Sequence, residues 1–296
     1  MKTLKLFTLL TILAVVLSSC GNKKAKTGDA SAEAFDLQQY IEAAKAITPN
    51  MDNIGNYIDA LELVDAKYYP MLMNDPYKAQ EYKTSFPVAA VNLGIYSIDI
   101  IYHVYGDAID AAYLSFAAAQ ELARFVGVEG AFAATTFDAF EGAAASRDSV
   151  TLMFNNLLTE SQNYSTEKEI LFVHTAYLAG AYIEKMYIMS SLIQQALKSD
   201  EFTQEDEINL KESIVIYVER LKSVDVLLTA IEAQIDQLKS LELLAQFQEL
   251  RTLATSIEAG EAEILAASNA ELRESEKLQQ SFDIISNIRS MLVTTN

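Results

Sequence analysis

Apolar residues recur every three or four positions along most of this chain, and no segment alternates apolar and polar residues for long enough to indicate a strand. Glycine (10 residues) and proline (4 residues) are scarce, whereas all-β chains need many of the turns that these residues form. The pattern therefore predicts an all-α protein, a multi-helix bundle built from antiparallel helical hairpins. The predicted helices span residues 31–47, 51–68, 76–83, 87–105, 108–126, 131–143, 149–160, 167–198, 204–239, 241–258 and 271–293.

Local chemistry marks several of the predicted helix ends. All four prolines lie in the first third of the chain, so we expect short helices early and longer ones later. The residues expected to begin helices are Asp75, Asp107, Ser146, Thr166 with Glu169 as a capping box, and Thr203 with Asp206, and the glycines expected to end them are Gly106, Gly127 and Gly260.

The sharpest periodicity lies within residues 204–239, where apolar residues are separated by alternating steps of four and three from Leu210 to Leu238. A 3.5-residue repeat forms a narrow seam that packs lengthwise against a neighbouring helix. The repeat ends where Glu242 takes the next seam position. The adjoining amphipathic helices can cover this seam from within the chain, and an intermolecular coiled coil is the alternative.

The first twenty residues have the layout of a secretory signal. Lys2 and Lys5 precede an apolar stretch, residues 6–17, that is too short to span a bilayer, and small residues then lead to Cys20, the single cysteine. This arrangement resembles the lipobox of bacterial lipoproteins, in which the cysteine becomes the acylated N-terminus. We therefore expect a signal peptide at 1–19, a lipidated flexible tether at 20–29 and one helical domain at 30–296.

The resemblance to lipoproteins also implies a location. Gly21 follows the cysteine, where an aspartate would signal retention in the inner membrane. An outer-membrane protein facing the periplasm is therefore expected, with the cell surface as the alternative. The apolar stretch 86–105 is interrupted by Asn92, Asp99 and His103, which favours a buried core helix over a membrane span.

Charge narrows the choice of partners. The chain carries 41 acidic and 22 basic side chains, a net charge of −19, whereas a nucleic-acid-binding surface needs a basic footprint. The expected partners are the lipid bilayer, through the acylated Cys20, and an unknown small molecule or envelope protein.

Asp99 and His103 stand four residues apart on one predicted helix face. With Asp107 they could form a row of metal ligands, but Asp107 is expected to cap the next helix, which favours a buried hydrogen-bonded pair of Asp99 and His103. His174 has no carboxylate three or four residues away and is expected in the core. The sequence contains no Glu-x-x-His, zinc-protease, Gly-x-Ser-x-Gly or phosphate-loop motif, so we expect no metal, no cofactor and no catalytic residue.

A faint internal repeat places two acids in matching positions. The segment Leu93-Gly94…Ile98-Asp99…Tyr102 recurs as Leu178-Ala179…Ile183-Glu184…Tyr187. Because apolar residues flank both acids, we expect at least one to be buried beside a donor such as Arg147, His103 or a tyrosine hydroxyl. Six residues are therefore candidates for either the floor of a polar groove or a buried network: Asn92, Tyr96, Asp99, His103, Arg147 and Glu184.

Four short elements add a family resemblance. These are Asn92-Leu93-Gly94-Ile95-Tyr96…Asp99, Val126-Gly127-Val128, Arg147-Asp148-Ser149 and Gly180-Ala181-Tyr182-Ile183-Glu184. Together they resemble a group of all-helical lipoproteins from Gram-negative bacteria, although Tyr182 stands where that group is expected to have tryptophan. The resemblance implies a location and a fold, and it implies no activity.

Three functions remain open at this point. The first is a non-enzymatic binding or scaffolding lipoprotein with a helix-lined groove. The second is a structural envelope protein that self-associates through residues 204–239. The third is a metal-dependent enzyme without a recognisable motif.

Overall fold

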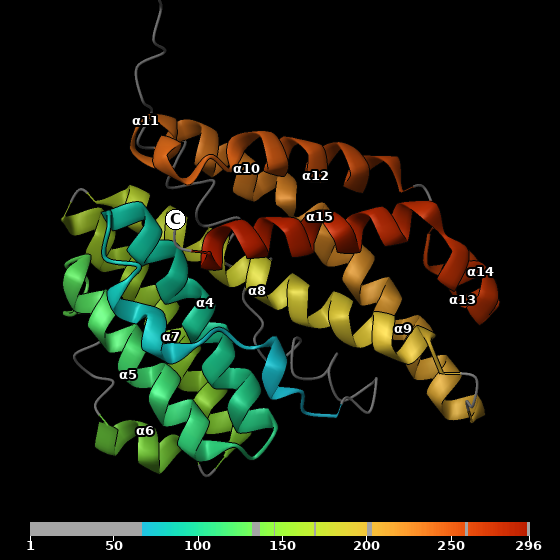
Figure 1. The fold of residues 1–296 in the computed structure, drawn as a ribbon, viewed down its shortest axis with the longest axis horizontal. Coiled ribbons are helices and arrows are strands. Elements are labelled where there is room, and N and C mark those ends of the chain that lie inside the picture. Colours follow the sequence, from blue (N-terminus) through green and yellow to red (C-terminus); the bar gives the residue numbers. More distant parts are fainter. Residues whose placement is uncertain are drawn as a thin grey trace, which may run out of the picture. The chain divides into compact units, whose positions relative to one another are not determined.

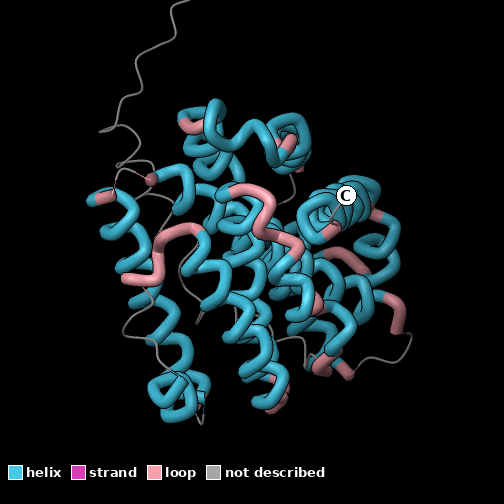
Figure 2. The backbone as a smooth tube through the Cα atoms, turned by 60° about the vertical axis from the view of Figure 1, so that its left-hand side comes forward, coloured by secondary structure: helices cyan, strands magenta, loops and turns pink. Residues whose placement is uncertain are grey.

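The computed structural model describes residues 67–131, 137–144, 146–168, 170–199, 203–257 and 260–294. Within these ranges all regular structure is helical, with no strand, which confirms the all-α prediction (Figures 1 and 2). The signal peptide, Cys20, the tether and the predicted helices 31–47 and 51–68 lie outside the described residues. The described residues all belong to one compact unit, residues 37–296.

Two helices, α4 (Phe86–Tyr105) and α8 (Leu171–Leu197), form the most extensively packed pair in this unit. Their backbones approach closely at two glycines. A Cβ atom at Gly94 would lie 2.0 Å from the Tyr177 carbonyl oxygen, and one at Gly180 would lie 1.8 Å from the Val91 carbonyl oxygen. No other residue type fits at either position without moving a helix.

Helix α4 is the one described helix that is long and apolar enough to cross a membrane by length and composition. Of its most apolar window, 89% is buried inside the protein. The burial agrees with the expectation of a core helix, because a soluble core helix passes the same test of length and hydropathy.

The remaining helices surround this central pair. Helix α5 (Ile109–Phe125) packs along α4, and α7 (Arg147–Glu167) contacts both α4 and α8 after the short α6 (Phe137–Ala144). Helix α15 (Glu276–Val293) contacts α8, α4 and α12 (Leu244–Ser256). Figure 1 shows it running between α8 and the pair formed by α10 (Val224–Ala233) and α12.

The prediction of a single helix over 204–239 is wrong. The segment divides into α9 (Gln204–Lys222), α10 (Val224–Ala233), α11 (Ile235–Leu238) and the 3-10 turn η3 (Lys239–Leu241). Ser223 and Gln234 are the breaks, and Gln234 leaves helical geometry with φ −117° and ψ 20°. The seam residues are nevertheless buried, apart from the partly buried Ile235, because they pack against the chain's own α8, α12 and α13 (Glu261–Ala266).

Other helix boundaries also differ from the prediction. The predicted helix 271–293 is two helices, α14 (Asn269–Glu274) and α15, and α13 was not predicted. The predicted helix 76–83 is a short 3-10 helix, η2 (Pro76–Gln80), preceded by a second one, η1 (Pro70–Leu72). Two prolines that lack a backbone N–H keep this region from forming a longer helix.

Five of the local end signals are confirmed. The Asp75 side chain accepts from Tyr77 N–H at the start of η2, and Thr203 and Asp206 form a complete capping box at the start of α9. Ser146 accepts from the Ser149 N–H at the start of α7, Gly106 is the residue that ends α4, and Gly127 follows α5 with a left-handed φ of 78°. Each of these signals acts within a few residues, so sequence alone identifies it.

Three other end signals are wrong. Asp107 does not cap α5; it takes φ 55° in the turn before it, while Gly106 is required there because a Cβ atom would meet the Tyr68 ring at 2.3 Å. Thr166 lies inside α7 and donates to the Gln162 carbonyl. Gly260 begins α13 instead of ending a helix.

Candidate functional site

Six buried or nearly buried polar side chains gather where α4, α8 and α15 meet the N-terminal part of the described chain. We call them the buried polar cluster: Asn74, Tyr82, Asn92, Asp99, Glu184 and Arg289. Three of them, Asn92, Asp99 and Glu184, are candidates from the sequence, and both acids are 0% exposed. The close crossing at Gly94 and Gly180 brings the two matched acids together, so that each contributes to the electrostatic environment of the other.

Arg289 of α15 is the cation that neutralises Glu184. Its Nε donates to Oε2 at 3.0 Å and its Nη2 donates to Oε1 at 3.1 Å, a bidentate pair in which Glu184 is fully buried. The same Nη2 also donates to the Leu72 carbonyl at 3.0 Å, and the guanidinium lies 4.7 Å from the centre of the Tyr187 ring. The guanidinium is therefore fixed on several sides, which is the geometry that a buried ion pair requires.

Arg289 is not among the donors predicted from the sequence, which were Arg147, His103 or a tyrosine hydroxyl. The side chain of Arg147 lies outside the described residues, at the start of α7. A signal for Arg289 was present, because it stands seven residues after Phe282, four after Ile285 and three before Leu292, on the same helix face as this buried apolar stripe. An arginine inside such a stripe must reach a buried acceptor or leave the core.

Asp99 has a different environment from Glu184. Its Oδ2 accepts from the Asn74 backbone N–H at 3.1 Å, while its Oδ1 is buried and no described donor reaches it. Burial, together with the neighbouring charge of Glu184, raises the pKa of Asp99 well above its ordinary value, although Arg289 partly opposes the shift. Asp99 therefore favours its neutral form.

The remaining members connect the cluster to the C-terminal end of α15. Asn92 Nδ2 donates to the Leu292 carbonyl at 3.0 Å, and the Tyr82 hydroxyl donates to the Val293 carbonyl at 3.1 Å. The Tyr82 hydroxyl also lies 3.0 Å from Asn74 Oδ1. These bonds satisfy carbonyls at a helix end that has no intrahelical donors left.

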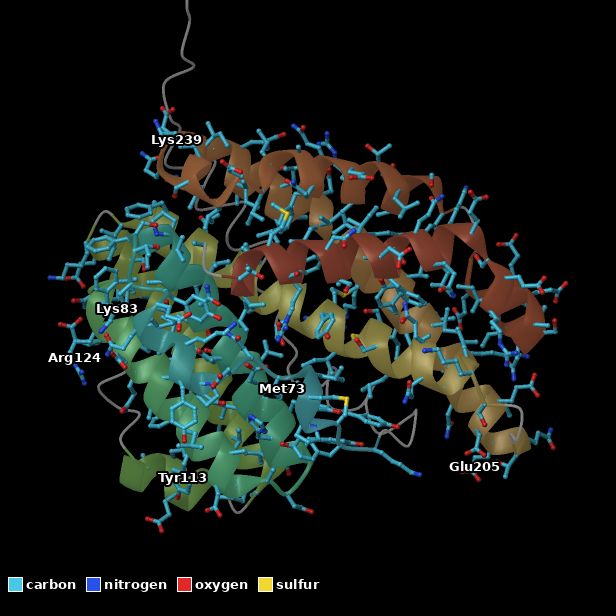
Figure 3. The ribbon with its side chains drawn as sticks, in the orientation of Figure 1. Met73, Lys83, Tyr113, Arg124, Glu205 and Lys239 are labelled. Carbon is cyan, nitrogen blue, oxygen red and sulfur yellow. The ribbon has the colours of Figure 1, made fainter. Side chains whose placement is uncertain are left out.

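Residues 67–75, which we call the strap, lie along α4 and are held by its side chains (Met73 of the strap is labelled in Figure 3). The Tyr69 N–H donates to the Tyr102 hydroxyl at 3.1 Å, and the Tyr96 hydroxyl donates to the Asp75 carbonyl at 2.7 Å. Because the strap is not α-helical, its backbone groups depend on such partners. Tyr96, a candidate from the sequence, therefore binds backbone.

The expected pair of Asp99 and His103 is wrong. His103 Nδ1 lies 2.7 Å from the hydroxyl of Tyr68 in the strap, whereas Asp99 bonds to the Asn74 N–H. Burial lowers the pKa of His103 to about 4, so the ring is neutral at pH 7. Spacing on one helix face could not reveal that the strap supplies a nearer partner.

His174 is buried in α8, in agreement with the expectation of a core residue. Its Nδ1 lies 3.5 Å from the Ser161 hydroxyl, and burial lowers its pKa to about 4. Within the described ranges, no three His, Cys, Asp or Glu side chains cluster closely enough to hold a metal ion.

A groove of about 610 Å³ lies beside the buried polar cluster. Its walls come from Tyr82–Val91, from the turn Ser240–Glu242 and from the last residues of α15, and they mix hydroxyl groups with apolar side chains. Tyr82 and Leu292 belong to both features, since each lines the groove and bonds to the cluster through its hydroxyl or its carbonyl. The cluster therefore fixes the position of two residues that line the groove.

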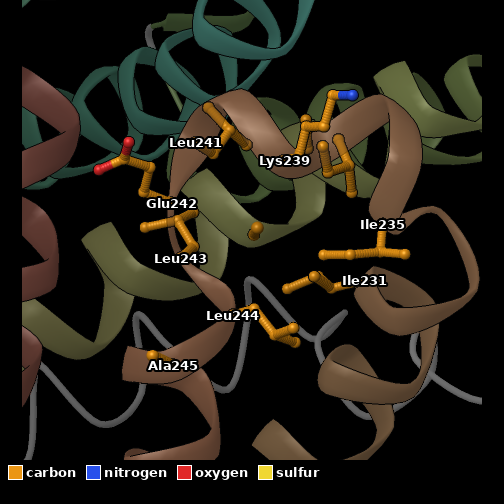
Figure 4. A pocket seen from close by; sticks show the side chains of 11 residues that line it. Ile231, Ile235, Lys239, Leu241, Glu242, Leu243, Leu244 and Ala245 are labelled. Atoms are coloured by element: carbon orange, nitrogen blue, oxygen red, sulfur yellow. The ribbon is translucent and has the colours of Figure 1, made fainter.

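A smaller apolar cavity of about 180 Å³ lies on the other side of the same turn (Figure 4). Leu241 and Glu242 line both spaces. Glu242 has a left-handed φ of 50°, and Figure 4 shows its carboxylate directed away from Ile231 and Ile235, which line the small cavity. The residue at which the heptad repeat ends is thus the residue at which the chain turns to separate two cavities.

Comparison with known proteins adds no family. The chain matches no protein-family model, no curated protein and no solved structure at a significant level. The resemblance to all-helical lipoproteins stays a prediction.

Proposed function

We propose that this protein is a non-enzymatic binding or scaffolding lipoprotein of the bacterial envelope, anchored through an acylated Cys20 in the outer membrane and facing the periplasm. The signal-like segment that ends at the single cysteine supports the anchor. The observation that carries the binding role is the groove beside the buried polar cluster, whose volume of about 610 Å³ is within the range of small-molecule sites.

The chemistry of the groove favours an amphipathic ligand. Val88, Val91 and Leu292 offer apolar surface, while Thr84 and Ser290 offer hydroxyl groups at its edge. Such a lining orients a ligand by a few hydrogen bonds and holds it by apolar contact. Self-association through residues 204–239 is less favoured, because the side chains of that seam pack inside the chain.

The anchor is tested by metabolic labelling of growing cells with an alkyne fatty acid. The full chain should take up the label and fractionate with membranes, and Cys20→Ala should lose both properties. Label retained in Cys20→Ala, or a wild-type chain found without label in the soluble fraction, would contradict the anchor.

The groove is tested by native mass spectrometry of the full chain extracted from its own membrane. Ser290→Trp places a large ring in the groove, and Ser286→Trp places the same ring on an exposed position of the same helix outside it. We expect a bound mass that is lost in Ser290→Trp and kept in Ser286→Trp. If both variants keep it, the groove is not the binding site.

A partner protein instead of a small molecule would give a different result in cells. A photo-crosslinking amino acid at Thr84, an exposed position of the groove, should then form a specific adduct with one envelope protein. The same amino acid at Ser286 is the matched control. If the chain shows no bound mass and forms no adduct, the binding role is contradicted altogether.

A further inference from the structure

The buried polar cluster contains more acid than base. Asp99 and Glu184 are both 0% exposed, and the cation that the described residues place beside them is Arg289, whose side chain is 13% exposed. The other titratable groups that act on Asp99 or its partners are tyrosines: Tyr96 on α4, Tyr187 on α8, Tyr82 after η2 and Tyr68 in the strap. Tyrosines are neutral at pH 7, so two carboxylates here would leave one buried negative charge uncompensated.

The hydrogen bonds show which carboxyl oxygen of the two acids lacks a donor. Both oxygens of Glu184 accept from Arg289, and Asp99 Oδ2 accepts from the Asn74 N–H. Asp99 Oδ1 is the one carboxyl oxygen of the two acids that no described donor reaches, and it is buried. An ionised carboxylate would keep an unsatisfied acceptor there, whereas a protonated oxygen becomes a donor and needs a neighbouring acceptor.

We propose that Asp99 and Glu184 bind one proton between them in the folded protein at neutral pH, with Asp99 as the neutral acid whose Oδ1 donates to the Glu184 carboxylate. The cluster then consists of a neutral acid, a carboxylate and a guanidinium, and its net charge is zero. The raised pKa of Asp99, caused first by burial and then by the neighbouring Glu184, agrees with this assignment.

The bound proton makes the stability of the protein fall with rising pH in one window. Asp99 has a higher pKa folded than unfolded, so between about pH 4 and its folded pKa the folded chain holds a proton that the unfolded chain has lost. The stabilisation is complete below about pH 4 and decreases as pH rises toward the folded pKa. The proton lies next to two attachments of the strap, the Asn74 N–H on Asp99 and the Leu72 carbonyl on Arg289.

Infrared spectroscopy of the full chain in detergent at pH 7 observes this proton directly. A neutral carboxylic acid has a C=O stretching band that is separate from the carboxylate bands. We expect one such band, shifted when only the aspartates carry ¹³C in the side-chain carboxyl group and absent from Asp99→Asn. The matched control is Asp225→Asn, at an exposed aspartate of α10, which should keep the band.

Asp99→Asn should also fold. The asparagine carbonyl can accept from the Asn74 N–H and its amide can donate to Glu184, which reproduces the neutral acid. Urea unfolding between pH 5 and pH 8 should therefore show a smaller loss of stability with rising pH in Asp99→Asn than in the wild type. Absence of the acid band from the labelled wild type overturns the proposal whether or not the variant folds, and an unfolding equilibrium raised more than tenfold at pH 7 in Asp99→Asn overturns it as well.

Discussion

Replacement of Arg289 by methionine is the most informative change at this site. Methionine keeps the length and apolar stem of the side chain but removes the bidentate partner of the fully buried Glu184 and the donor to the Leu72 carbonyl. Removing one partner of a buried ion pair costs about 3–5 kcal/mol, because the remaining charge is left without compensation. Folded domains are stable by only about 5–15 kcal/mol, so the variant should lose a large share of its stability.

Thermal and urea unfolding of the full chain measure this loss. For a domain of this size, each kcal/mol corresponds to roughly 2–4 °C, so Arg289→Met should lower the Tm by about 6–20 °C. The matched control is Arg251→Met on α12, whose guanidinium lies 3.8 Å from Asp225 on the surface. The Arg251 side chain is 38% exposed and the Asp225 side chain is 64% exposed, so that variant should lose less than about 1 kcal/mol.

A double-mutant cycle separates the ion pair from packing. When Glu184→Gln is combined with Arg289→Met, no charge of the pair remains buried. The double variant should therefore lose about 1–3 kcal/mol less stability than the sum of the two single losses. Lower pH should also reduce the loss in Arg289→Met, because a protonated carboxyl group needs no counter-charge. An Arg289→Met variant as stable as Arg251→Met, or additive single losses, would refute the view that Arg289 compensates a buried charge.

Three further changes test other parts of the molecule. Gly180→Ala should destabilise the protein by about 1–3 kcal/mol in urea unfolding, since its Cβ would lie 1.8 Å from the Val91 carbonyl oxygen; an unchanged midpoint would contradict the close helix crossing. His103 and His174 have a pKa of about 4 when folded, so they should stabilise the protein fully above about pH 6.5 and lose that contribution as pH falls toward 4; NMR titration of their ring protons with midpoints near 6.5 would contradict this. Thr203→Ala removes a complete capping box and should cost about 0.5–2 kcal/mol, whereas Thr252→Ala on the exposed face of α12 should cost less.

The sequence predicted the features that depend on near neighbours along the chain. Helical class follows from apolar spacing, and the starts of η2 and α9 follow from side chains that bond to backbone two or three residues away. Burial of Asp99 and Glu184 could also be predicted, because each stands among apolar residues on a helix that has no polar face to offer. These signals need only a few residues to act.

Tertiary structure alone decided which groups meet in the core. Glu184 is 105 residues from Arg289, and Asp99 is 25 residues from the Asn74 N–H, so no local spacing encodes either pair. The divided helix 204–239 has the same origin, because its heptad pattern continues across Ser223 and Gln234 while packing against α8 and α12 requires the chain to turn there. A buried charge must be neutralised by whatever the fold brings within reach, and that choice is made by the packing of distant segments.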